Sequence, residues 1–170
     1  MTDMKPVEIV AFNRALSSDA FCCGKPELDD WLRTKAGQQE RSDNTRTFLA
    51  IDPERDGVAG YYATTTYRLD LDQAATAYGV GRRKYPVPAV LLARLAVDER
   101  FAGQGIGRQL LVHAMEGIAS ASNVLGFEIV VVHAIDADAV TSYARYGFTR
   151  FAEHPLHLFM PTKTLRATLL

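Results

Sequence analysis

Three closely spaced glycines, followed at once by a helical pattern, form the stretch of the chain best suited to chemistry. Gly103, Gly105 and Gly107 lie within residues 94–111, where apolar residues then recur at helical spacing. The first turn of a helix carries unpaired N–H groups and a partial positive charge of about half an elementary unit. Glycines let a diphosphate approach that backbone without meeting a Cβ atom. Alone, a Gly-x-Gly pair more often only turns a corner, so its interpretation depends on the elements around it.

The predicted strands and helix around the turn follow one another at short spacing in the sequence. Residues 87–97, which precede it, are nearly all apolar and predict a strand buried on both faces. An amphipathic helix follows the turn, and after it come a second apolar strand at 127–133 and the segment Tyr-Ala-Arg-Tyr-Gly-Phe at 143–148. A strand, a glycine turn and a helix in direct succession favour an anion site over a simple corner.

The rest of the chain predicts shorter elements. Apolar stretches bounded by turn residues predict strands at 7–12, 45–52, 58–69 and 156–160. Acidic residues after Pro26 predict a helix that runs to about Gln39. Residues 71–85 lack periodicity and predict a loop with one helical turn, and 165–170 predict a tail.

Composition limits the class of protein. A chain of 170 residues with 48% hydrophobic content fits a single domain over residues 1–170. The net charge of −1 means that nucleic-acid binding would need a local basic patch. The adjacent Cys22 and Cys23 predict two reduced thiols and no metal site. The first 21 residues contain no apolar run typical of a signal peptide or membrane span, so we expect a cytoplasmic protein with no membrane contact.

The order of elements over residues 89–159 resembles the acetyl-CoA-binding core of the GNAT N-acetyltransferases. The resemblance implies an α/β fold with a central mixed, mostly antiparallel sheet, splayed strands and flanking helices, and acetyl-CoA as cosubstrate. Ala102 stands where the family's loop usually begins with Gln or Arg, which removes a polar side chain but no backbone amide. The pyrophosphate-binding residues implied by the resemblance are Gly103, Gln104, Gly105, Ile106, Gly107 and Arg108.

The resemblance also assigns roles to the strand before the turn. The pantetheine arm of the cosubstrate would lie along Leu95, Ala96 and Val97 like an added strand. The backbone amide of Val97 would polarise the thioester carbonyl, and such a donor is worth about 3 kcal/mol in a transition state. Leu95 and Val97 would also be ordinary core residues, because their side chains can pack while their amides bind.

Acetyl transfer to an amine expels a thiolate, which a positioned acid can protonate. The family's acid is the tyrosine four residues before the glycine of a YxxxGF pattern, and this matches Tyr143. Tyr146 lies three residues later on nearly the same helical face, so the sequence alone leaves it open as an alternative. We identify no general base. An α-amine has a pKa near 8, so a useful fraction is already neutral at cellular pH and can attack without a base. Asp98 and Glu99 lie at a strand end, where we expect their carboxylates to be solvated.

The N-terminal half narrows the resemblance to the GNAT toxins of type II toxin–antitoxin modules. The matching segments are residues 21–32, 46–48, 60–62, 86–88 and 93–98. This likeness implies acetylation of the α-amine of aminoacyl-tRNA, inhibition of translation, a ribbon-helix-helix antitoxin as partner and a homodimer.

Basic residues supply candidate contacts to such a substrate. Arg33 belongs to a basic group near the first predicted helix, which also includes Lys35, Arg41 and Arg46. Arg82, Arg83 and Lys84 form a second basic group in the irregular loop, and solvated surface charge is the simpler interpretation of both groups. Arg94 differs, because a charge in a buried strand needs a partner. It would face the acceptor or a cofactor phosphate, or pair with an internal carboxylate.

Two other classes of function fit the sequence. The chain could be a GNAT enzyme that acetylates a small amine or a protein N-terminus. It could also be a non-catalytic relative that acts as an interaction module and does not bind acetyl-CoA.

Overall fold

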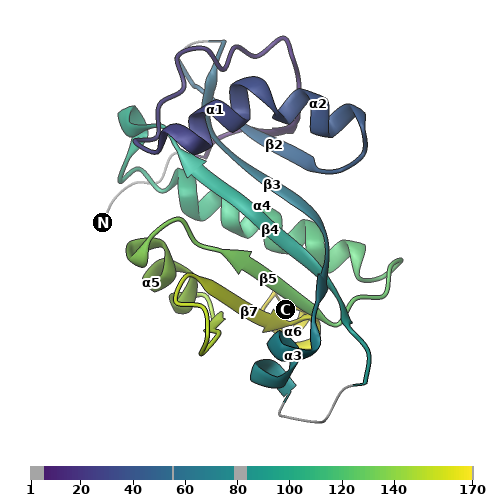
Figure 1. The fold of residues 1–170 in the computed structure, drawn as a ribbon. Coiled ribbons are helices and arrows are strands. Elements are labelled where there is room, and N and C mark those ends of the chain that lie inside the picture. The colour runs from purple at the N-terminus through teal and green to yellow at the C-terminus, as the bar shows by residue number, and fades with distance from the viewer. Residues whose placement is uncertain (1–5, 55, 79–83, 170) are drawn as a thin grey trace. The chain divides into compact units, whose positions relative to one another are not determined.

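Three long elements run through both of the compact units into which the chain folds. They are strand β3 (Val58–Leu69), strand β4 (Val87–Val97) and helix α4 (Ile106–Ala121) (Figure 1). The structure is a computed structural model and describes residues 6–54, 56–78 and 84–169. The first unit comprises Met1–Thr64 and Arg94–Ala114, and the second comprises Thr65–Ala93 and Met115–Leu170. The expectation of one domain over the whole chain stays a prediction.

The first unit is built on the strand order β1-β2-β3-β4. Strand β1 (Ile9–Ala11) pairs antiparallel with β2 (Arg46–Ile51), and β2 pairs antiparallel with β3. Helices α1 (Pro26–Thr34) and α2 (Ala36–Arg41) lie between β1 and β2 in sequence. The single helix predicted to end near Gln39 is therefore two helices, which meet at Lys35.

Neighbouring tyrosines of β3 fix a helix to each face of this sheet. Successive side chains of a strand point to opposite faces. The hydroxyl of Tyr61 donates a hydrogen bond of 2.8 Å to the backbone oxygen of Leu28 in α1. The hydroxyl of Tyr62 shares a hydrogen bond of 2.6 Å with Nδ1 of His113 in α4. Helix α1 therefore covers one face and α4 the other.

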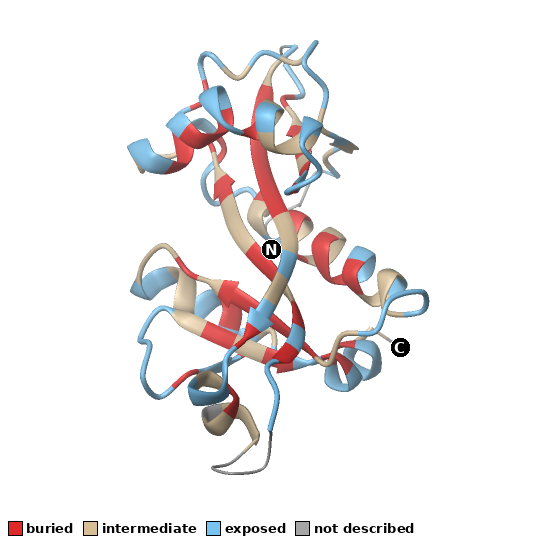
Figure 2. Cartoon of the chain, turned by 45° about the vertical axis from the view of Figure 1, so that its right-hand side comes forward, coloured by how far each residue is buried: buried red, intermediate tan, exposed pale blue. Residues whose placement is uncertain are grey.

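Gly60 allows α4 to approach β3 closely. A Cβ atom at this position would lie 2.9 Å from Cδ1 of Leu110, closer than real Cβ atoms come, and 3.0 Å from the backbone oxygen of Ala96, which is a tight contact. Helix α4 turns Leu110, Leu111 and Ala114 inward, and all three are buried. Figure 2 shows that one side of this helix is buried and the other exposed.

The second unit continues the sheet in the order β3-β4-β5-β7-β6. Strand β4 pairs parallel with β5 (Ile129–His133), which pairs antiparallel with β7 (His157–Pro161). The short β6 (Thr149–Arg150) pairs antiparallel with the other edge of β7. Helices α5 (Ala137–Arg145) and α6 (Thr162–Thr168) both contact β7. The predicted α/β fold with a mixed, mostly antiparallel sheet and flanking helices is confirmed.

Alternate residues of the central strands form the core of the second unit. One face of the sheet buries Leu69 of β3, Val87, Ala89 and Leu91 of β4, and Ile129 and Val131 of β5. Helix α3 (Leu71–Tyr78) adds Ala74 to the same cluster. The alternation follows from the geometry of a strand, in which successive side chains point to opposite faces of the sheet.

Two predictions about irregular segments are wrong. Residues 71–78 form helix α3 and not a loop with one turn, because Oδ1 of Asp70 accepts a hydrogen bond of 2.8 Å from the amide of Gln73 and caps the helix. The predicted tail at 165–170 is mostly helix α6, in which Leu165 is fully buried. Tertiary burial, of Ala74 in α3 and of Leu165 in α6, also stabilises both helices, and a short segment of sequence does not reveal it.

The reduced state predicted for the cysteines agrees with the structure, in which Cys22 and Cys23 are free thiols. None of the helices in the described residues is long and apolar enough to cross a bilayer.

Three histidines stack in the second unit. His133 of β5 and His157 of β7 are register partners whose rings stack with centroids 3.8 Å apart. His154 stacks on His157 at 4.6 Å, and Tyr67 meets His133 edge-on at 5.8 Å. Burial, together with the nearby charge of His154, lowers the pKa of His157. The folded protein therefore favours the neutral form of this imidazole.

The stack predicts a loss of stability in mild acid. Because the pKa of His157 is lower in the folded than in the unfolded chain, the unfolded chain binds more protons between the folded pKa and about 6.5. The free energy of unfolding should be highest above that range and fall as the pH decreases from about 7.5 to about 5.5. Urea unfolding of the His157→Gln variant should show a shallower pH dependence than the original chain, and equal slopes would contradict this account.

Candidate functional site

The glycine turn after β4 leaves a row of backbone amides without acceptors. Gly103 and Gly105 have φ angles of 77° and 81°, which favour glycine, and α4 begins directly after them. The amide of Gln109 donates to the oxygen of Gly105, which starts the helical pattern. Within the described part of the chain, no acceptor receives a hydrogen bond from the amides of Gly105, Ile106, Gly107 and Arg108.

The space in front of this turn is open. A Cβ atom at Gly103 would meet no other atom within 4 Å. At Gly107 a Cβ would lie 3.5 Å from Cγ2 of Val97, so the helix packs directly onto the end of β4. Gln104 differs from its neighbours, because its amide already donates to the oxygen of Phe101 at 3.3 Å. The turn fits a pyrophosphate through its other amides, as helix N-termini and glycine turns do.

The end of β4 has a free edge beside this turn. The register between β4 and β5 ends at the pair Leu92 and Val132, so Leu95, Ala96 and Val97 lie beyond it. The amide of Asp98 donates to the oxygen of Ala59 in β3 at 2.8 Å. Because amides alternate between the two edges of a strand, the amide of Val97 points away from β3. Such an edge can accept an extended ligand as an added strand.

A buried carboxylate holds the end of this strand in place. Asp98 is 1% exposed, and its Oδ2 accepts a hydrogen bond of 3.1 Å from the amide of Cys22. Its Oδ1 accepts from the amide of Arg100 at 2.9 Å and from Nε of the same residue at 3.1 Å. Nη1 of Arg100 also lies 3.3 Å from Oδ2 of Asp52 at the end of β2. The expectation that Asp98 is solvated is therefore wrong, whereas Glu99 is exposed as expected.

The electrostatics of Asp98 follow from these contacts. Burial by itself raises the pKa of this carboxyl group. Hydrogen bonds from the side chain and amide of Arg100 and from the amide of Cys22 outweigh that effect and hold the pKa below its ordinary value. Asp98 is therefore a charged structural anchor between the proposed thioester-binding amide and the glycine turn.

Arg94 lies on an aromatic platform. Its guanidinium carbon is 4.3 Å from the ring centroid of Trp31, which in turn stacks on Tyr61 at 5.9 Å with an angle of 8° between the rings. Burial lowers the pKa of Arg94, and no carboxylate in the described residues pairs with it. Of the alternatives, pairing with a described internal carboxylate is excluded. The cation is available to a ligand, and cation–π contact holds it in place.

The candidate acid lies on α5 in the second unit. Tyr143 is 6% exposed, and its ring packs edge-on against Phe148 at 5.9 Å. Burial raises the pKa of its hydroxyl, which makes no hydrogen bond within the described residues. Tyr146 follows the last residue of α5 as its C-cap and is only half-buried. Tyr143 is thus the better protected proton donor of the two.

The predicted basic residues that the structure describes belong to both units. Arg33 is in the first unit, where it pairs with Asp30 at 3.0 Å, and Lys84 is exposed in the second unit. Arg82 and Arg83 lie outside the described residues. The described residues contain no group of three or more His, Cys, Asp or Glu side chains placed to hold a metal ion. The sequence did not predict Trp31 as a platform, although this residue lies within a segment that resembles the toxins.

The chain is similar in sequence to known acetyltransferases. The sequence model of a family described as "Acetyltransferase (GNAT) domain" matches residues 43–150. A tRNA-acetylating toxin of Mycobacterium tuberculosis is 36% identical over 151 residues, which are 87% of each chain.

Solved structures show the same likeness. AtaT complexed with acetyl-methionyl-tRNAfMet is 28% identical and has a TM-score of 0.83, over 97% of this chain and 100% of that one. A tyrosine-to-phenylalanine mutant of the AtaT toxin, bound to the C-terminus of the antitoxin AtaR and to acetyl-CoA, is 29% identical. Its TM-score is 0.79 over 96% of this chain and 98% of that one.

The Asp98 anchor predicts a specific effect of Asp98→Asn. The amide has nearly the same shape, but it removes the charge that the donors of Cys22 and Arg100 share, so the free energy of unfolding should fall by about 2 kcal/mol in urea at neutral pH. Because the folded pKa is lowered, the difference from the original chain should persist to about pH 4 and shrink below it. Glu99→Gln, an adjacent exposed carboxylate, serves as the control and should be nearly neutral. An equal effect of the two substitutions would contradict the anchor.

Proposed function

The chain belongs to the GNAT family of acetyltransferases, and we propose that it transfers the acetyl group of acetyl-CoA to the α-amine of aminoacyl-tRNA. An acetylated α-amine cannot attack a peptidyl ester, so the product blocks translation. The chain would therefore act as the toxin of a toxin–antitoxin pair. The alternative, acetylation of a small amine or a protein N-terminus, would use the same acetyl-CoA site.

The observation that carries this proposal is the row of unpaired amides beside an open space, in a chain 36% identical to a tRNA-acetylating toxin. In our proposal the amides of Gly105, Ile106, Gly107 and Arg108 hold the pyrophosphate, with Gly103 leaving room for it. Leu95, Ala96 and Val97 hold the pantetheine arm along the free strand edge. Acetyl-CoA supplies a thioester that an amine can attack.

The bonds and protons of the reaction balance without a further reagent. The neutral amine nitrogen attacks the thioester carbonyl, a C–N bond forms, and the C–S bond breaks. The amide of Val97 donates a hydrogen bond to the carbonyl oxygen as negative charge develops there. Tyr143 gives its hydroxyl proton to the departing sulfur, and the proton lost by the nitrogen restores the tyrosine. A tyrosine hydroxyl has an ordinary pKa near 10 and is protonated at cellular pH, which this role requires, and burial raises the pKa of Tyr143 further.

In our proposal, basic residues bind the tRNA that accepts the acetyl group. Arg94, held over Trp31 and free of a described carboxylate, is proposed to contact the acceptor end of the tRNA. Arg33 and the segment Arg82, Arg83 and Lys84 are proposed to contact its backbone phosphates, which would make binding dependent on salt.

The proposed function also implies protein partners for this chain. The AtaT structure shows a toxin of this fold with the C-terminus of its antitoxin AtaR. We propose that a ribbon-helix-helix antitoxin neutralises the present chain and that the chain forms a homodimer. The cytoplasm is its proposed location, because charged tRNA is found there.

Tyr143→Phe tests the acid. The substitution deletes only a hydroxyl, so kcat should fall by about two orders of magnitude while the affinity for acetyl-CoA, measured by calorimetry, stays close to that of the original chain. Tyr146→Phe is the matched control and should retain most of the activity. If Tyr146→Phe is inactive and Tyr143→Phe is active, the acid is one helical turn further on.

The substrate can be tested directly. Purified protein is incubated with radiolabelled acetyl-CoA and a set of charged tRNAs, with uncharged tRNA and free amino acids as controls. Label should appear on charged tRNA alone, and its distribution gives the amino-acid preference. Efficient labelling of free small amines, with charged tRNA unlabelled, would refute the proposal and support the small-amine alternative.

A further inference from the structure

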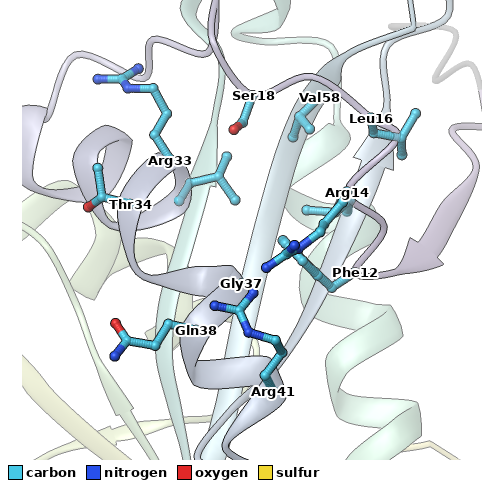
Figure 3. Close-up of a pocket in the computed structure, with 12 residues that line it drawn as sticks. Phe12, Arg14, Leu16, Ser18, Arg33, Thr34, Gly37, Gln38, Arg41 and Val58 are labelled. Carbon is cyan, nitrogen blue, oxygen red and sulfur yellow. The ribbon is translucent and has the colours of Figure 1, made fainter.

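A pocket of about 510 Å³ lies in the first unit, away from the glycine turn in sequence (Figure 3). Its walls come from the loop after β1, from α1 and α2, and from β2 and β3. Phe12, Leu16 and Leu49 give it apolar walls, and Arg14, Arg33 and Arg41 also line it. The guanidinium of Arg33 points away from the other two and donates a hydrogen bond of 2.8 Å to the backbone oxygen of Phe21 (Figure 3). Its volume is in the range of pockets that bind small ligands or parts of larger ones.

Two of these arginines have no counter-charge. In the first unit, Arg33 pairs with Asp30, Arg46 pairs with Glu40 and Asp43, and Arg100 pairs with Asp98 and Asp52. By contrast, neither Arg14 nor Arg41 has a carboxylate or hydrogen-bond partner among the residues described. The neighbouring carboxylates Glu40 and Asp43 both pair with Arg46, and neither forms an ion pair with Arg41.

The two unpaired guanidinium groups converge over Gly37. A Cβ atom at Gly37 would lie 3.5 Å from Nη1 of Arg41 and 3.7 Å from Nη2 of Arg14. Figure 3 shows both side chains reaching toward this glycine from different elements. Like charges that face one point repel each other, and an anion at that point removes the repulsion. A guanidinium also presents a planar fork of N–H donors that matches a phosphate.

We propose that this pocket binds a backbone phosphate of the acceptor tRNA through Arg14 and Arg41, with Arg33 at its rim. The choice of a nucleic acid rests on the proposed function. Phe12, whose Cζ atom is also 3.5 Å from the position of that Cβ, adds a flat apolar surface beside the cations. A nucleotide presents both a phosphate and an aromatic base, and aromatic side chains stack on bases.

The first test removes the two charges. The Arg14→Gln/Arg41→Gln variant should lower the affinity for uncharged tRNA by about tenfold, and the slope of log affinity against log salt should shrink by about 0.7 to 0.9 for each phosphate that the variant no longer neutralises. The KM for charged tRNA should rise, whereas kcat and the affinity for acetyl-CoA should not change. Arg150→Gln/Lys163→Gln removes the same charge from exposed positions of the second unit and is the control.

The second test places a negative charge inside the pocket, at the point where a phosphate would bind. Gly37→Glu places a carboxylate beside both guanidinium groups, so it should reproduce the loss of tRNA affinity while both arginines remain. Gly37→Gln is a neutral control of the same size and should bind tRNA more tightly than Gly37→Glu. Thermal unfolding of each variant establishes that it is folded.

The outcomes separate this inference from the function on which it rests. Unchanged tRNA affinity and salt slope in both Arg14→Gln/Arg41→Gln and Gly37→Glu would overturn the phosphate site, while the original chain still acetylates charged tRNA. Loss of binding to an acidic protein partner, with tRNA affinity intact, would assign the pocket to that partner and also overturn the proposal. If the original chain acetylates no charged tRNA, the proposed function fails, and the salt slope for uncharged tRNA still decides whether the pocket binds phosphate.

Discussion

The buried carboxylate of Asp98 is the interaction on which the candidate site of the first unit depends. It joins the end of β4 to the loop at Cys22 and, through Arg100, to the end of β2 at Asp52. Val97 directly precedes it, and the glycine turn follows a few residues later. Catalysis by backbone amides works only if those amides are held within about 0.5 Å of their productive positions. A charged anchor with several donors, in place of a mobile loop, meets that requirement.

Local patterns predicted the parts of this site that depend on local sequence. The bounds of β3 and β4 agree with the apolar stretches that predicted them, and Gly103 and Gly105 in the turn do adopt left-handed angles. The stacking of Arg94 on Trp31 could not be predicted, because these residues are 63 positions apart in the sequence and meet only through the fold. The burial of Asp98 was missed for the same reason. A carboxylate at a strand end is ordinarily solvated, and only Cys22 and Arg100 together make its burial favourable.

The net charge of −1 does not show which arginines form ion pairs with carboxylates and which do not. Several arginines of the first unit are neutralised by carboxylates nearby, whereas Arg14, Arg41 and Arg94 have no such partner among the described residues. Counting charges in the sequence cannot separate these two groups, because the pairing depends on which side chains the helices and strands bring together. Bulk charge therefore gives little information about whether this chain binds nucleic acid, and the unpaired cations give more.

The free edge of β4 has a consequence for the handling of this protein. An unpaired strand edge is a template for pairing with another chain, and natural proteins limit that hazard with short edges and with charges. Here the edge that is not paired with β5 spans only Leu95 to Val97, and Arg94 places a cation at its beginning. A ligand that lies along the edge occupies the groups through which a second chain would add. The cosubstrate would thus protect the protein against aggregation, and preparations depleted of it would be the first to form insoluble material.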